Sequence, residues 1–160
     1  MRDCLKVIIG ALLAVALVAP SYALTVTSGT VTMVQAGAYT GQALPVELKT
    51  VAYSWTSNTS GQVTATLAEL EGTIVRCVVN PADGASSPTA SYDALINDVD
   101  GNDILGGQGA NLSQSTNKNT VLTVTDGTTA RPITVYGNHT LLITSAGSAK
   151  SGLIRFFIRP

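Results

Sequence analysis

The sequence has few of the residues from which common active sites are built. Among its 160 residues it contains one histidine, two cysteines and one tryptophan. With His139 as its only histidine, the chain cannot form the usual zinc sites that need a second one, and no HExxH or GxSxG pattern is present. We therefore expect no catalytic residues. We interpret His139, at the start of a predicted strand, as a surface residue.

The chain has too few cysteines to stabilise its fold by disulfide bonds. Cys4 precedes an N-terminal apolar run, so Cys77 alone would remain if that run were removed. A lone cysteine cannot form a disulfide within the chain. Cys77 shares one side of a β-branched stretch with Val75 and Val79, and we expect it to be a small buried hydrophobic residue.

Charge is also sparse, since only 12% of the residues are charged. Residues 24–160 hold seven basic and nine acidic residues, which gives a formal net charge of −2. Such a chain lacks the positive surface that binds nucleic acid or an anionic membrane. A surface made largely of Thr, Ser, Asn, Gln and Gly fits an exposed extracellular β protein.

The one long apolar run lies at the N-terminus. Val7 to Val18 follows two basic residues and is followed by a proline and the small-x-small sequence Ser21-Tyr22-Ala23. This order is typical of a secretory signal peptide, and the run is too short for an ordinary membrane span. We expect residues 1–23 to be a signal peptide and residues 24–160 to form one domain. Retention of an uncleaved apolar N-terminal segment is the alternative.

Short β-branched segments separated by turn residues recur from residue 24 onward, and none keeps an apolar period of about 3.6 over several turns. About seven to nine such strands predict an all-β fold, a single antiparallel β-sandwich of the jelly-roll or immunoglobulin-like type. We expect strands over 24–35 (with a bend or bulge at Ser28-Gly29), 44–55, 62–70, 73–79, 92–97, 120–125, 138–144 and 151–159. Connections are expected at 36–43, 56–61 and 80–89, and the last two strands are expected to pair as a closing hairpin.

The most distinctive stretch is Ser91 to Ser113, with a predicted strand, an acidic turn, a second short strand and a glycine-rich loop. The Asp100-Gly101 pair between two apolar segments is a strong hairpin signal. Asp98, Asp100 and Asn102 have the alternating spacing of an EF-hand, but Asp103 replaces its turn glycine and no glutamate closes the loop.

A second calcium interpretation comes from residues 101–109, which resemble one turn of a secreted RTX nonapeptide repeat. A single copy cannot complete a site, because these repeats bind calcium between successive turns. A hairpin without metal or other cofactor is therefore the main prediction. A weak structural calcium at Asp98, Asp100 and Asp103 is the alternative.

The same stretch resembles small uncharacterised proteins encoded among phage and prophage structural genes. The resemblance rests on Tyr92-Asp93, the Asp-Gly turn, the aliphatic pair Ile104-Leu105 and the Gly-x-Gly-Ala-Asn segment at 107–111. Weaker similarity extends it over most of residues 45–159. It implies a virion-associated β-sandwich, such as a capsid decoration protein, a head fibre or a tail accessory component, without catalytic residues.

We therefore expect a non-enzymatic phage or prophage structural protein that acts through contacts with other virion subunits or with itself. Open edges of Thr- and Ser-rich strands favour a homo-oligomer. We expect no nucleic-acid partner and no membrane insertion of the domain. The alternative is a secreted or periplasmic binding or adhesion module, located in the periplasm or outside the cell instead of in the virion.

Overall fold

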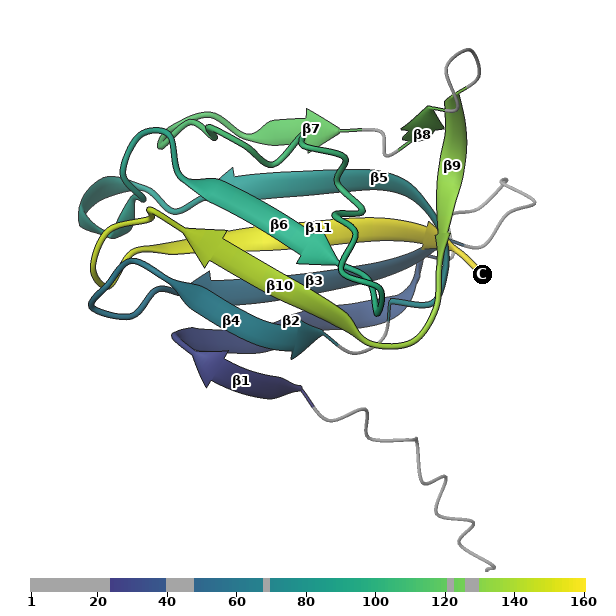
Figure 1. The fold of residues 1–160 in the computed structure, drawn as a ribbon, viewed down its shortest axis with the longest axis horizontal. Coiled ribbons are helices and arrows are strands. Elements are labelled where there is room, and N and C mark those ends of the chain that lie inside the picture. Colours follow the sequence, from purple (N-terminus) through teal and green to yellow (C-terminus); the bar gives the residue numbers. More distant parts are fainter. Residues whose placement is uncertain (1–23, 40–47, 68–69, 121–122, 126–129) are drawn as a thin grey trace, which may run out of the picture.

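The computed structural model describes residues 24–39, 48–67, 70–120, 123–125 and 130–160 (Figure 1). The predicted signal peptide, residues 1–23, lies outside this part of the chain. Within the described residues, no helix is long and apolar enough to cross a membrane.

Two antiparallel sheets face each other, which confirms the predicted all-β sandwich. The four-stranded small sheet has the order β1 (Thr25–Ser28), β4 (Val63–Leu67), β10 (His139–Thr144), β6 (Asp93–Asn97). The seven-stranded large sheet has the order β2 (Thr30–Tyr39), β3 (Leu48–Thr56), β11 (Ser151–Arg159), β5 (Gly72–Pro81), β9 (Ala130–Val135), β8 (Thr123–Thr125), and β7 (Lys118–Thr120) also pairs with β5. A single 3-10 turn, η1 (Gly84–Ser86), lies in the connection after β5.

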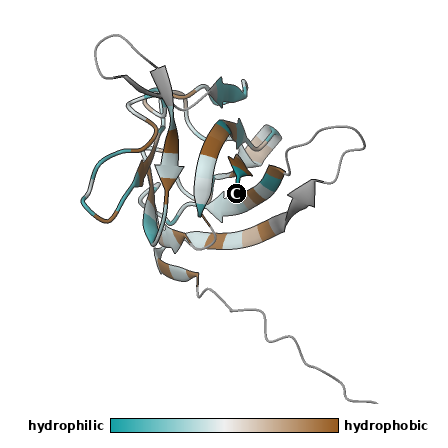
Figure 2. Cartoon of the chain, turned by 90° about the vertical axis from the view of Figure 1, so that its right-hand side faces the viewer, coloured by the Kyte–Doolittle hydropathy of each residue, from teal (hydrophilic) through white to brown (hydrophobic). Residues whose placement is uncertain are grey.

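Alternating burial along the strands places the core between the sheets. In β11 the side chains of Ile154, Phe156 and Ile158 are fully buried, whereas the residues between them are partly exposed. This is the period of two expected for strands with one face on a core. Hydrophobic and polar bands accordingly alternate along the strands in Figure 2. Tyr53 of β3 packs edge-to-face on Phe156, with ring centroids 6.4 Å apart.

The predicted bend at Ser28-Gly29 is confirmed, and it has a larger role than the sequence indicated. At Gly29 the chain leaves the small sheet at the end of β1 and enters the large sheet as β2. The backbone there has a φ of +71°, and a Cβ atom would lie 2.6 Å from the carbonyl oxygen of Thr56. One continuous segment therefore supplies an edge strand to each sheet.

The predicted closing hairpin is wrong. The strand that begins at His139 (β10) lies between β4 and β6 of the small sheet, whereas β11 lies between β3 and β5 of the large sheet. The connection crosses from one sheet to the other, with positive φ angles at Ser145, Gly147 and Ala149. Strands that are adjacent in sequence need not pair, and periodicity does not report which sheet a strand joins.

The boundaries and number of the other strands also differ from the prediction. β2 continues to Tyr39 and so occupies part of the expected connection at 36–43; residues 40–43 lie outside the described chain. The single strand predicted at 120–125 is two short strands, β7 and β8. β9 was not predicted, because its sequence ARPITV contains a proline and has no clear alternation.

Cys77 is buried as predicted, with 2% of its surface exposed. Burial raises the pKa of its thiol to about 12, so the thiol stays protonated. Its predicted neighbour Val75 does not share this buried face. The register of β5 against β11 shifts between Phe157 and Ile158, which moves the buried side of β5 from Cys77 to Ile74.

Candidate functional site

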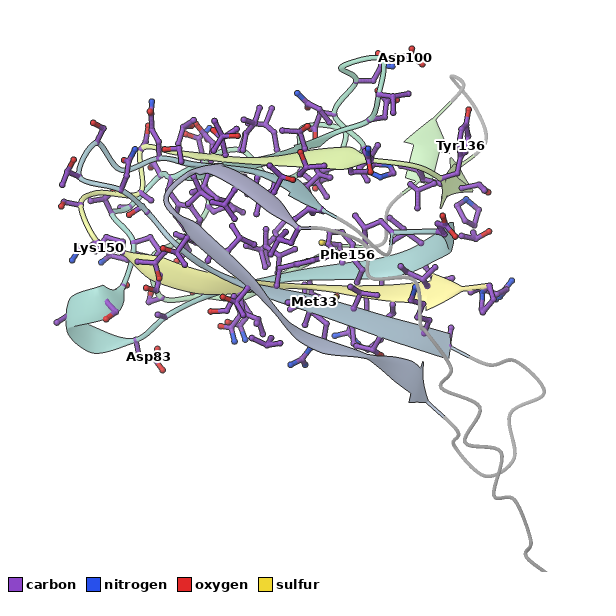
Figure 3. All side chains as sticks on the ribbon, turned by 90° about the horizontal axis from the view of Figure 1, so that it is seen from below. Met33, Asp83, Asp100, Tyr136, Lys150 and Phe156 are labelled. Carbon is purple, nitrogen blue, oxygen red and sulfur yellow. The ribbon has the colours of Figure 1, made fainter. Side chains whose placement is uncertain are left out.

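Two turns lie beside each other at one end of the sandwich. Residues 98–102 form the turn after β6, and residues 136–138 connect β9 to β10. A Cβ atom on Gly137 would lie 4.0 Å from Cγ1 of Val99, so the turns are in contact. Asp100 and Tyr136 accordingly lie at the same corner of the molecule in Figure 3. We call residues 98–102 together with 136–139 the two-turn end.

The acidic turn is held by the side chain of Asp98. Its Oδ1 accepts hydrogen bonds from the N–H groups of Asp100 (2.9 Å) and Asn102 (2.8 Å), and the amide of the Asn102 side chain donates to Oδ2 at 3.1 Å. The hydrogen bonds from Asn102 are the main cause that lowers the pKa of Asp98. The carboxylate is therefore ionised at neutral pH, and the predicted Asp-Gly turn is confirmed.

The second strand of the predicted hairpin does not form. Asn97 and Asp103 make one isolated bridge, and Ile104 N–H donates to the carbonyl of Ile96 at 2.8 Å. Beyond this point the chain runs along the edge of β6 as a loop. Leu112 N–H then donates to the carbonyl of Tyr92 at 2.7 Å, so the loop closes this edge of the small sheet.

Asp103 fixes the beginning of that loop. Its carboxylate accepts hydrogen bonds from the backbone N–H groups of Ile96 (3.2 Å), Leu105 (3.0 Å) and Gly107 (2.9 Å). The next aliphatic residues, Ile104 and Leu105, are buried in the core. One carboxylate and two apolar anchors therefore hold the glycine-rich loop against β6.

The structure does not gather the predicted calcium ligands. Among the described residues, no group of three or more His, Cys, Asp or Glu side chains could hold a metal ion. Asp98 and Asp103 instead bind the N–H groups of their own turns, and Asp100 is exposed between them. Calcium at Asp98, Asp100 and Asp103 thus stays a prediction.

His139 is buried, so the prediction of a surface histidine is wrong. Only 2% of its surface is exposed, because it begins β10 on the core-facing side, opposite Leu67. Burial lowers the pKa of His139, and the Gly137 carbonyl and the charge of Asp98 only partly oppose this. The ring is therefore neutral at pH 7. Its Nδ1 lies 3.1 Å from the Gly137 carbonyl oxygen, which assigns the proton to Nδ1 as the donor.

A hollow of about 100 Å³ lies between the two turns. His139 lines it together with Val99 and Tyr136, and these last two side chains are 67% and 77% exposed. Both are among the large hydrophobic residues that the sandwich leaves in contact with solvent. Tyr136 was not predicted as a site residue because the strand before it was not predicted, and an isolated tyrosine carries no functional signal of its own.

No protein-family model matches this sequence, and no curated protein matches it at a significant level. The indications of function therefore come from the two-turn end and from the pattern of residues 91–111.

Proposed function

We propose that this chain is a non-enzymatic structural protein of a phage or prophage particle, and that it acts through protein–protein contacts. The resemblance of residues 91–111 to proteins from phage structural gene clusters supports this role. The observation that carries the contact function is the exposure of Val99 (67%) and Tyr136 (77%) on two adjoining turns.

These two side chains suit a contact surface because the turns that present them are already ordered. Asp98 binds two backbone N–H groups of its turn, and Gly137 accepts the hydrogen bond of the buried His139. A partner would not have to order the backbone on binding, which lowers the entropic cost of association. Tyrosine also contributes a large rigid area and is common among the residues that dominate binding energy.

The same geometry favours contact over catalysis. His139 would be the natural general base of this end, but only 2% of its surface is exposed, so little of its ring is accessible to a substrate. Its Nδ1 is bonded to the Gly137 carbonyl, and the Asp98 carboxylate is bonded to its own turn. The two-turn end thus presents the exposed side chains of Val99 and Tyr136 to a partner, beside the carboxylate of Asp100.

The second candidate is a secreted or periplasmic binding or adhesion module. It is favoured by the apolar run Val7 to Val18 and the small-x-small sequence after it, which predict export. In that case the two-turn end would serve the same contact function toward a surface ligand, with or without a calcium ion at Asp98, Asp100 and Asp103.

Mass spectrometry of particles purified from an induced culture of the source organism separates the two candidates. Peptides of this chain in the particles, with an N-terminus at or near Met1, are expected for a virion component. Peptides found only in the periplasm or medium, with an N-terminus near Leu24, would overturn the virion proposal and support the exported module.

The contact surface is tested by Tyr136→Ala, which should reduce the amount of chain retained on particles. Asp83→Ala is the control, because Asp83 is also exposed but lies at the opposite end of the molecule from Tyr136 (Figure 3). Equal retention of both variants would show that the two-turn end is not the attachment surface.

A further inference from the structure

The two sheets share one margin, at which β1 and β2 are the outermost strands. β1 is the first strand of the small sheet, β2 is the first strand of the large sheet, and Gly29 joins them. In Figure 3 this segment, Thr25 to Tyr39, crosses the front of the molecule from one sheet to the other. Within the part of the chain that the structure describes, no strand pairs with the outer edge of β1 or β2. The opposite edge of the small sheet is covered by the loop after β6.

The composition of this margin offers little protection against pairing with another strand. Natural sheets usually block their edges with lysine, other charged residues or proline. Residues 24–44 contain no charged residue and no proline. One irregularity is present, since the register of β2 against β3 shifts at Val34.

Apolar side chains are concentrated along the same margin. Val26, Met33 and Val34 are 37%, 38% and 54% exposed. Val26 pairs with Ala65, and Met33 pairs with Tyr53, both of which are fully buried. Val26 and Met33 therefore lie on the core-facing sides of their strands, yet they stay more than one third exposed because no further strand among the described residues lies beside them.

The backbone groups that face outward can be identified from one hydrogen bond. Ser57 N–H donates to the carbonyl of Lys150 at 2.8 Å, so Ser57 faces β11. Successive residues in a strand direct their N–H and C=O groups to opposite neighbours, and alternate residues of β3 therefore face β2. By the register of β2 against β3, the N–H and C=O groups of Val31 and Met33 point away from β3.

We propose that β2 pairs in antiparallel fashion with β2 of a second copy of this chain, so that the two large sheets form one continuous sheet. Antiparallel pairing of one strand with itself is what a two-fold axis generates, and each copy then offers the other the same surface. The segment has no charge that would attract a charged partner or repel its own copy. A second β2 also brings its own Met33 and Val34 to cover the apolar groups left exposed.

This inference deepens the proposed function by naming the second copy as a partner, and its test does not depend on particles. Sedimentation velocity of the full chain between about 1 and about 100 µM should show a monomer that becomes a dimer as the concentration rises. Val34→Lys, which puts a charge on the edge, should weaken the dimer at least about tenfold.

Gln108→Lys is the control. It puts the same charge on an exposed residue of the loop after β6, at the opposite edge of the small sheet, and should leave the dimer unchanged. Both positions are exposed, so both variants should keep the melting temperature of the monomer. A monomer over the whole concentration range, or equal effects of the two variants, would overturn self-pairing through β2.

Amide hydrogen exchange tests the geometry independently. The N–H groups of Val31 and Met33 should exchange at least about tenfold more slowly at concentrations where the dimer dominates. Thr32, which faces β3 within the same strand, is already protected and should change little. Unchanged exchange at Val31 and Met33 in a dimer would show that the copies meet elsewhere.

The two proposals can fail separately. A dimer that is never found in particles would leave the self-pairing intact and remove the virion role. A chain that is monomeric in solution but loses particle retention on Val34→Lys would overturn self-pairing and assign the edge to a strand of a different virion protein.

Discussion

The carbonyl oxygen of Gly109 accepts a hydrogen bond from Ala94 N–H at 2.8 Å, and the two backbones are so close that a Cβ atom on Gly109 would lie 1.8 Å from the Ala94 carbonyl oxygen. The backbone of the glycine-rich loop is thus in direct contact with the edge of β6. Only glycine fits at this position, which gives a physical reason for the second glycine of the Gly-x-Gly-Ala-Asn segment.

Gly109→Ala should therefore destabilise the protein by about 2–3 kcal/mol, since the added methyl group meets a backbone atom that cannot move without breaking the β6 pairing. Urea denaturation measures this change. Gly106→Ala is the control: a Cβ atom there meets nothing within 4 Å, and only its φ of +58° opposes alanine. It should lose about 1 kcal/mol. Equal losses would mean that the loop lifts away from β6 without penalty.

Asp103→Ala should lower the free energy of unfolding by about 1–2 kcal/mol, because three backbone N–H groups lose their acceptor. Asp100→Ala, at the exposed tip of the preceding turn, should change it by less than about 0.5 kcal/mol. Melting temperatures of the unmodified chain and of Asp100→Ala, each measured with calcium and with a chelator, test whether the turn binds the ion. A calcium-dependent rise in melting temperature that Asp100→Ala removes would instead support the predicted metal site.

The stability should fall as the pH is lowered from 7.5 to 5, because His139 is the only histidine and its pKa is lower in the folded chain than the ordinary value of 6.5. Above 6.5 the ring is neutral in both states, and stability does not depend on it. As the pH falls through 6.5, the unfolded chain takes up a proton that the folded chain does not, so unfolding is favoured. The loss is complete below the folded pKa.

Melting temperatures measured across this range test the assignment. His139→Asn should be less stable but should lose the pH dependence between 7.5 and 5. The same decline in the variant would mean that His139 does not titrate in this way, and the drop would have to come from carboxyl groups.

The class of fold could be predicted from the sequence because alternating burial is a local property. The residues that the core buries recur at every second position, Ile154, Phe156 and Ile158 in β11 and Ala94 and Ile96 in β6, and each of them is apolar. The pairing of strands is not local. Nothing in residues 145–150 shows that the connection crosses between sheets, and the periodicity of β10 would be the same in either sheet.

The candidate site could be predicted only in part for the same reason. The Asp98 turn depends on residues close in sequence, and it was found. Its neighbour, Tyr136, comes next to Val99 only because β9 and β10 bring the second turn to the same end. His139 was wrongly predicted to lie at the surface. The first residue of a strand has an alternating neighbour on only one side, and this is too little to define which of its faces is buried.

Tyr92→Phe tests a polar group inside the core. The rings of Tyr92 and Trp55 lie 5.8 Å apart, and neither the Tyr92 hydroxyl nor Trp55 Nε1 has a hydrogen-bond partner among the described residues. Burial raises the pKa of Tyr92 to about 12.

A buried hydroxyl without a partner loses its hydration without compensation, so its removal by Tyr92→Phe should raise the free energy of unfolding by about 1 kcal/mol. Tyr92→Leu, which also removes the ring that packs against Trp55, is the comparison and should lose stability. If Tyr92→Phe is instead destabilising by a similar amount, the two polar groups must share a buried water, and the centre of the sandwich is wetter than its apolar lining indicates.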